Sequence, residues 1–360
     1  MSVHAPLSRR TAGLAPALVV LLGVLLVAGP AQAATKRADA GPPDLKENVD
    51  YTFNAYFPRT ITVHKGDSVR WRFFGFHTVT FLPKGRQRPP FLVQDAAHPY
   101  TGINDAAGSP FWFNGRPSFD FNPLAAFPAG GKAVTGKAFR NSGLPLEPGA
   151  PKPYTVKFTR TGTFKYICQI HRDMEGFVKV VSRRARIPTA AQDRRTVKRE
   201  EAADTRKAAR LRSFTPPAAT IRGGHDSDPV EIYRFFPRNL TVNAGQPVTF
   251  TSTAPEPHTI SFGPIPELKA LANAQPTPMQ FNGPNAPPTL WLDGRVILPS
   301  DPPPLPPYTG SNHGNGFFST GALGQLVPGT SSTSFTFTKP GIYRYICLIH
   351  SFMSGTVTVR

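Results

Sequence analysis

The chain has 360 residues, a length that favours two domains over one. Its 41 Pro and 31 Gly disfavour a helical bundle and favour short strands joined by many turns. The formal net charge is +19, and the presence of only two Cys excludes a disulfide-dense scaffold.

The first 33 residues have the pattern of a secretory signal peptide. Arg9 and Arg10 precede an apolar run of 12 residues, 17–28, and Ala31-Gln32-Ala33 resembles a cleavage site. The run is shorter than the about 20 residues of a membrane span, although an uncleaved anchor is the alternative. The arginine pair also fits twin-arginine export, which carries folded proteins. We therefore expect a secreted, periplasmic or cell-envelope protein without stable membrane insertion.

The remaining sequence contains two copies of one unit. The matching segments are residues 57–63 with 236–242, 77–81 with 258–262, and 162–181 with 341–360. Because two copies are too few for a solenoid, we interpret the repeat as a tandem pair of domains, at residues 45–181 and 230–360.

Each copy has the pattern of β-strands. In Ser68–Phe74, apolar Val69, Trp71 and Phe73 alternate with arginines, which is typical of a half-buried strand. No segment inside either copy shows a convincing helical period. Several short strands with turn signals in about 130 residues predict an all-β protein of two β-sandwich domains.

Two kinds of segment interrupt this pattern. Residues 182–229 hold 12 Lys and Arg against 6 Asp and Glu. Thr189–Leu211 is rich in Ala, Arg and Glu, which is compatible with a helix, but it has almost no apolar stripe and so no face to bury. We interpret residues 182–229 as a basic linker, either a spacer or a surface that docks an acidic partner or anionic envelope. Residues 83–150 and 263–330 are long irregular inserts, which either cover one end of the domains or elaborate the surface.

Cysteine, histidine and methionine recur with one spacing in both copies. The candidate metal ligands are His77, Cys168, His171 and Met174 in the first copy, and His258, Cys347, His350 and Met353 in the second. One thiolate, two imidazoles and a distant thioether form the ligand set of a blue-copper site. The spacing i, i+3, i+6 places Cys, His and Met on one short loop, and the upstream His comes from a neighbouring strand end.

On these motifs, most of the chain resembles two cupredoxin domains of the plastocyanin, azurin and amicyanin type. The resemblance implies an antiparallel Greek-key β-sandwich, one type 1 copper per domain and electron transfer, with the eight residues above as the ligands of two coppers per chain. The sequence departs from the family where Thr78 and Thr259 follow the upstream His, since many members have Asn there. That Asn ties the ligand loops together and tunes the thiolate.

Other interpretations of these residues remain open. Cys168 and Cys347 are able to pair as a disulfide or to remain inert thiols, but neither alternative explains the repeated His and Met. Zinc is able to occupy the same ligands. The remaining histidines stand at non-equivalent positions and are expected to be solvated or hydrogen-bonded: His64, His98, His225 and His313.

Three functions compete for such a chain. The first is one-electron transfer without enzymatic activity. The second is a two-domain oxidase or nitrite reductase, but the chain has no His-x-His pair, and Gln169 and Leu348 follow the cysteines where a type 2 site needs His. The third is copper storage, which favours Met-rich tracts, whereas this chain has 4 Met.

Charge distinguishes the two copies. Residues 45–181 hold 18 Lys and Arg against 9 Asp and Glu, whereas residues 230–360 hold 7 against 5. Positive charge disfavours Cu(II), so we expect the higher reduction potential in the first copy. The basic first copy also predicts an acidic redox protein as partner, with salt-sensitive association, and no role in nucleic-acid binding. The sequence fixes neither the donor and acceptor nor the oligomeric state.

Overall fold

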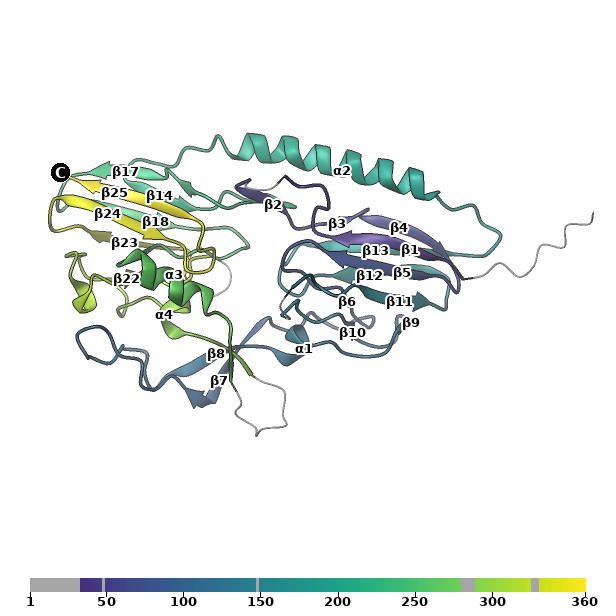
Figure 1. Cartoon of the computed structure of the whole chain (residues 1–360), viewed down its shortest axis with the longest axis horizontal. Helices are drawn as coiled ribbons and strands as arrows, with labels where there is room; N and C mark the ends of the chain where they lie inside the picture. Colours follow the sequence, from purple (N-terminus) through teal and green to yellow (C-terminus); the bar gives the residue numbers. More distant parts are fainter. Residues whose placement is uncertain (1–32, 47–48, 147–148, 280–288, 325–329) are drawn as a thin grey trace, which may run out of the picture. The chain divides into compact units, whose positions relative to one another are not determined.

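The computed structural model describes residues 33–46, 49–146, 149–279, 289–324 and 330–360 (Figure 1). The described chain is mostly β, with several sheets and few helices. The expected signal peptide, residues 1–33, lies outside the described residues except for Ala33. In the described part of the chain, no helix is both long and apolar enough to span a bilayer.

Two five-stranded sheets form the first half of the described chain. One sheet contains β1 (Thr35–Ala40), β3 (Tyr56–Phe57), β5 (Ser68–Phe73), β9 (Ala133–Val134) and β11 (Tyr154–Phe158). The other contains β4 (Thr60–His64), β6 (Thr80–Phe81), β10 (Arg140–Asn141), β12 (Gly162–Ile167) and β13 (Glu175–Val181). Their strand orders are β3-β1-β5-β11-β9 and β10-β6-β12-β13-β4.

Side chains from both sheets meet in one core. The alternation in β5 buries Val69 and Trp71 completely and leaves Arg70 exposed, as the sequence pattern predicts. Trp71 packs edge-on against Tyr166 of β12, with ring centroids 5.1 Å apart. Cys168 belongs to the same buried cluster, so the candidate ligand loop is anchored directly to this core.

The second half repeats this arrangement. One sheet contains β14 (Thr220–Gly223), β16 (Phe235–Phe236), β18 (Pro247–Thr251) and β23 (Ser332–Thr336). The other contains β17 (Asn239–Val242), β19 (Ser261–Phe262), β22 (Phe318–Ser319), β24 (Gly341–Ile346) and β25 (Ser354–Val359). The strand orders, β16-β14-β18-β23 and β17-β25-β24-β19-β22, match those of the first half strand for strand, apart from the edge strand β9.

Two strands lie outside the segments that the sequence assigned to the two copies. β1 precedes residue 45 and pairs in parallel with β5. β14 lies within the expected linker, 182–229, and pairs in parallel with β18. The sheets are therefore mixed rather than antiparallel as expected, since β4 also pairs in parallel with β13 and β17 with β25. β1 and β14 are both short and carry polar residues on one face. Their sequences alone therefore did not indicate that they belong to a sheet.

The expected spacer contains a long helix that is packed rather than free. α2 (Ala190–Leu211) begins at the N-cap Thr189 with a capping box and buries Glu201, Asp204 and Ala208 (Figure 1). Its docking uses ion pairs as well as apolar contacts: Arg59 lies 2.7 Å from Asp204. The sequence of this helix has no apolar stripe, because its buried face is held largely through paired charges.

α2 covers a small sheet that joins the two halves. β2 (Tyr51–Phe53) of the first half pairs antiparallel with β15 (Val230–Ile232) of the second. Phe53, Val230 and Ile232 form a buried cluster with Ala208 of the helix. Residues 34–360 consequently form one compact unit.

The two inserts form a joint structure. Four of their strands, β7 (Leu92–Pro99), β8 (Pro117–Phe121), β20 (Thr277–Met279) and β21 (Thr289–Leu292), form one sheet of order β20-β21-β8-β7, whereas β9, β10 and β22 belong to the sheets of the two halves. Their helices are α1 (Pro123–Ala126), α3 (Ile265–Asn273), α4 (Gly294–Ile297) and the 3-10 turn η1 (Asn312–Gly314). The sequence pattern did not predict α3, which is short and buries a single residue, Leu268.

A histidine connects the two inserts electrostatically. His313 Nδ1 lies 3.1 Å from Asp105, and its Nε2 lies 3.2 Å from Asp301. Hydrogen bonding to Asp301, together with Asp105, outweighs burial and raises the pKa of His313. Because the folded-state pKa is raised, this contribution to stability is complete below the ordinary histidine pKa and is lost as the pH rises through the folded-state value.

We therefore expect His313→Gln to lower the free energy of unfolding more at pH ~6 than at pH ~9. Denaturant unfolding of the wild type and the variant at both pH values measures the difference. An equal loss at the two pH values would contradict a role for the charged imidazole.

Candidate metal centres

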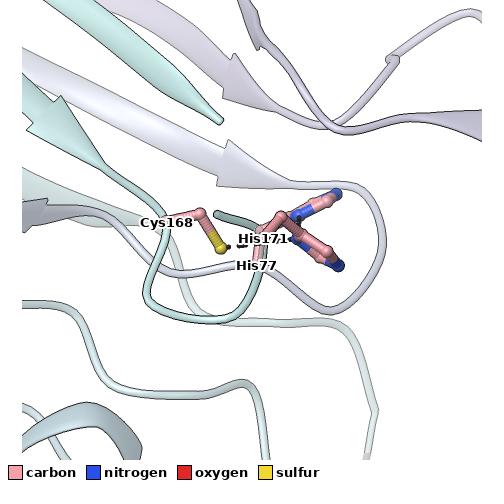
Figure 2. Close-up of side chains that lie close together, drawn as sticks. All are labelled: His77, Cys168 and His171. Atoms are coloured by element: carbon pink, nitrogen blue, oxygen red, sulfur yellow. Dashed lines mark hydrogen bonds between the residues drawn. The ribbon is translucent and has the colours of Figure 1, made fainter. Parts of the chain in front are cut away.

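The first centre lies where two strands end beside one loop. His77 lies shortly before β6, Cys168 follows β12, and His171 lies in the loop before β13. Nδ1 of His77 is 3.0 Å from Nδ1 of His171, and Sγ of Cys168 is 3.5 Å from the same His171 nitrogen. Figure 2 shows the three side chains converging, and all three are buried.

A tight turn positions the methionine after these ligands. The Met174 amide donates to the carbonyl of His171, and the Cys168 amide donates to the carbonyl of Met174. Met174 is 1% exposed and belongs to the same buried cluster as Cys168. The spacing of three residues between successive ligands thus corresponds to one closed loop between β12 and β13.

The second centre has the same construction. Sγ of Cys347 lies 4.0 Å from Nδ1 of His258 and 3.8 Å from Nδ1 of His350, and the two nitrogens are 3.3 Å apart. Met353 is buried, and the Cys347 amide donates to its carbonyl. The structure therefore brings the residues of each predicted ligand set together from the same elements in both halves.

The threonines after the upstream histidines tie each ligand loop to the neighbouring strand. The amide of Thr78 lies 3.4 Å from Sγ of Cys168, and its Oγ1 accepts a hydrogen bond of 2.8 Å from the Gln169 amide. Thr259 makes the corresponding contacts with Cys347 and Leu348, at 3.4 Å and 2.7 Å. Thr78 and Thr259 thus make the connection between the ligand loops that the resemblance to cupredoxins assigns to Asn.

The surroundings favour a thiolate in both centres. Burial raises the pKa of the Cys168 thiol, but hydrogen bonding and charge from His77, with two backbone N–H groups, lower it overall. His258 and His350 outweigh burial more strongly and lower the pKa of Cys347 well below its ordinary value. A metal ion that replaces the protons shared within such a set keeps the thiolate and both imidazoles as ligands. The donor set therefore fits copper.

Comparison with known proteins adds little to this geometry. No family model matches the sequence, and no curated protein matches it. Among solved structures, amicyanin from Paracoccus versutus is 16% identical, with 42% of this chain and 88% of amicyanin covered and a TM-score of 0.21. A mutant fern plastocyanin is 19% identical, with 39% of this chain and 99% of plastocyanin covered and a TM-score of 0.20. With TM-scores this low, the function is derived below from the residues themselves.

Glycines border the upstream histidines in both centres. Gly41, at φ +86°, follows β1, and a Cβ there would lie 2.9 Å from Nε2 of His77 and closer still to the carbonyl of Phe74. Gly224, at φ +69°, follows β14, and its Cβ would lie 2.7 Å from Nε2 of His258. Because these positions demand both a left-handed backbone and close approach, glycine alone allows the histidines their observed places.

The inserts pack against the ligand loops. Ile170, between Cys168 and His171, packs against a cluster formed by both inserts. Leu348, in the second loop, is buried in another such cluster. The inserts therefore contact the ends of the sheets that carry the candidate ligands. This is one of the two roles considered for them.

Other candidate residues are separated from these centres. Both cysteines are buried free thiols in different halves, so the disulfide alternative is not observed. His64, His98 and His313 lie against Asp67, Asp95 and two further aspartates, respectively. His225 stacks on Phe214, with ring centroids 4.0 Å apart.

Sequence reasoning missed two charged residues beside the centres. Arg88 of the first insert donates a hydrogen bond of 3.2 Å to the carbonyl of His171. Glu256 lies between His171 and His350, at 3.7 Å and 3.4 Å from their Nε2 atoms. Arg88 gave no signal because it stands in an irregular segment. Glu256 stands two residues before His258, where the first copy has Gly75, so the repeat itself concealed it.

Proposed function

We propose that this chain is an exported copper protein with two type 1 centres, and that it transfers single electrons. The observation that supports this proposal most directly is the doubled ligand set: in each half, one buried Cys Sγ and two His Nδ1 atoms converge beside a buried Met. Copper held by these residues would supply one-electron chemistry between Cu(II) and Cu(I).

The chain's own residues prepare both centres for this exchange. The Thr78 and Thr259 amides point at the thiolates and stabilise their negative charge. The Thr hydroxyls and the Met-to-Cys backbone bonds fix the loops on the sheet ends. Ligands held this way move little when the charge of the centre changes by one, which favours fast electron exchange.

The matching strand orders support the finer assignment of the fold. We infer that both halves are cupredoxin-type Greek-key β-sandwiches in tandem, each with one copper, and that the inserts were added at the ends that hold the ligands. Export through the signal peptide at residues 1–33 and an acidic redox protein as partner belong to the same proposal.

We favour a carrier over an oxidase or nitrite reductase because of where the spare histidines lie. His98 is 2.7 Å from Asp95, and His313 is held between Asp105 and Asp301. Within the part of the chain that the structure describes, the groups of residues close enough to hold a metal ion do not include His313.

The visible spectrum of copper-loaded protein, measured with the copper content and a redox titration, tests this function. We expect two coppers per chain, a strong band in the orange-red region and reversible one-electron reduction. Full copper content without the band would favour storage. Three or more coppers per chain would favour an oxidase.

Arg88 provides a test of the electrostatic cause that is expected to raise the potential of the first centre. Its guanidinium contacts the loop of the first centre. Replacing it by glutamine removes a half-buried positive charge. Loss of this charge stabilises the oxidised form of the first centre. We expect Arg88→Gln to lower the first centre's potential by about 1 kcal/mol, roughly 40 mV for one electron, after allowing for solvent screening.

Redox titration monitored separately in variants that retain one centre measures this shift. The potential of the second centre, measured with and without Arg88→Gln in the variant that retains only that centre, serves as the control. A first potential that does not change, or that rises, would contradict the electrostatic explanation.

A further inference from the structure

One carboxylate lies between the two centres. His171 and His350 each direct Nδ1 toward their cysteine. Their other ring nitrogens face Glu256: Oε2 is 3.7 Å from Nε2 of His171, and Oε1 is 3.4 Å from Nε2 of His350. A single side chain therefore contacts one candidate ligand of each centre, on the side away from the thiolate.

We propose that Glu256 connects the two centres into one electron-transfer unit, in which an electron passes between them through His171, the Glu256 carboxylate and His350. This inference rests on the proposed function, because it requires that both centres hold copper. It goes beyond that function by assigning an intramolecular route and the residue that completes it.

The contacts give Glu256 the chemistry of a connector. When Nδ1 of a histidine binds a metal, Nε2 carries a proton and becomes a hydrogen-bond donor. An ionised carboxylate has two oxygens and accepts one such bond on each. Glutamate therefore suits two facing donors, whereas a neutral amide accepts on only one side.

The backbone and neighbours hold Glu256 in this place. Pro255 and Pro257 flank it and restrict the chain on both sides. Glu231 lies nearby and is 4% exposed, and burial, with the charge of Glu256, raises its pKa. Glu231 accepts hydrogen bonds from Asn54 and from the Tyr233 hydroxyl, so a second neighbouring carboxyl has its own partners.

Tyr233 packs against His350, the histidine of the second centre that faces Glu256. Its ring packs on His350, with centroids 4.8 Å apart, while its hydroxyl is fixed on Glu231. The side chains of His171, Glu256 and His350 are only 9%, 14% and 13% exposed, so little water competes for their contacts. Such shielding strengthens contacts between charged and polar groups.

The sequence repeat shows that this carboxylate is not a feature of each copy. Glu256 stands two residues before His258, and Gly75 occupies the same position before His77. Only one copy supplies the connector, and both centres use it. A second glutamate at residue 75 would add a negative charge near His77, whose Nε2 lies 3.2 Å from the Cβ position of Gly75.

The transfer is balanced without any other reactant. One centre loses one electron and is oxidised, and the other gains it and is reduced. No bond is made or broken, and Glu256 keeps its charge. The histidine protons stay on Nε2.

The test compares full-length, copper-loaded proteins that all carry Met353→Gln, a change of axial ligand that gives the second centre its own potential and spectrum. Less than one electron per chain is injected rapidly, and the redistribution between the two absorption bands is followed. Glu256→Gln keeps the size of the side chain and removes one acceptor, and Glu256→Asp keeps the charge and shortens the reach. Glu267→Gln is the matched control, since Glu267 pairs with Asn315 in the second insert.

We expect a first-order redistribution whose rate does not depend on protein concentration. Glu256→Gln should slow it severalfold and raise both potentials, Glu256→Asp should slow it with smaller changes in potential, and Glu267→Gln should leave rates and potentials unchanged. A rate unaffected by either Glu256 variant would overturn the route, as would redistribution that occurs only between molecules. Protein without the blue bands would instead refute the proposed function, and the inference with it.

Discussion

Cys168→Ser is expected to remove one of two blue-copper centres and to leave the other intact. The absorption in the orange-red region depends on the Cys sulfur, so about half of its intensity should disappear and the copper content should fall toward one per chain. Cys347→Ser should have the same effect on the second centre. The comparison depends on the equivalence of the two ligand sets, which the matching contacts of Thr78 and Thr259 support.

Each serine variant also provides the control for the other. Serine is slightly smaller than cysteine, and its hydroxyl lies within reach of the threonine amide, so the fold should change little. Circular dichroism and denaturant unfolding of the copper-free proteins measure this. If one variant removes the entire band, or neither changes it, the assignment of two independent centres is wrong.

Gly41→Ala should disable the first centre from outside its ligand set. An added Cβ would meet the carbonyl of Phe74 at 1.9 Å and Nε2 of His77 at 2.9 Å. The backbone has to move, because a carbonyl cannot rotate away as a side chain does. We expect loss of the first centre's absorption, retention of the second, and a free energy of unfolding lowered by more than the about 1 kcal/mol of a left-handed alanine alone.

Gly245→Ala separates the two causes of this effect. Gly245 has a similar φ of +78°, and a Cβ there would meet no atom within 4 Å. It should therefore show the cost of the left-handed backbone without the collision, at about 1 kcal/mol, and keep both absorption bands. If Gly41→Ala behaves like this control, the glycine does not determine the position of His77.

The sequence predicted what depends on short-range pattern. Alternation in Ser68–Phe74 located a strand, because the side chains of a strand point alternately to its two faces. The repeated spacing from Cys168 to Met174 located a loop that closes on itself, since the three candidate ligands lie within seven residues. The repeat then indicated that the second half contains the same site.

Segments without such a pattern were misjudged or left open. The helix at Ala190–Leu211 was expected to lack a face for burial, but paired charges such as Arg59 with Asp204 dock it. The inserts had no periodicity to interpret. Their strands β8 and β21 come from different halves, and their pairing depends on a fold that is already in place.

The amino-acid sequence by itself determined the repeated unit, the candidate ligands and the class of metal that suits them, because ligand type and spacing are local properties of the chain. Only the tertiary structure decided which residues surround those ligands. Arg88 reaches the first centre from an insert, and Glu256 reaches His171 from the other half of the chain. Electrostatic contacts depend on distance in space, and residues 85 positions apart come within 3.7 Å only when both halves pack together.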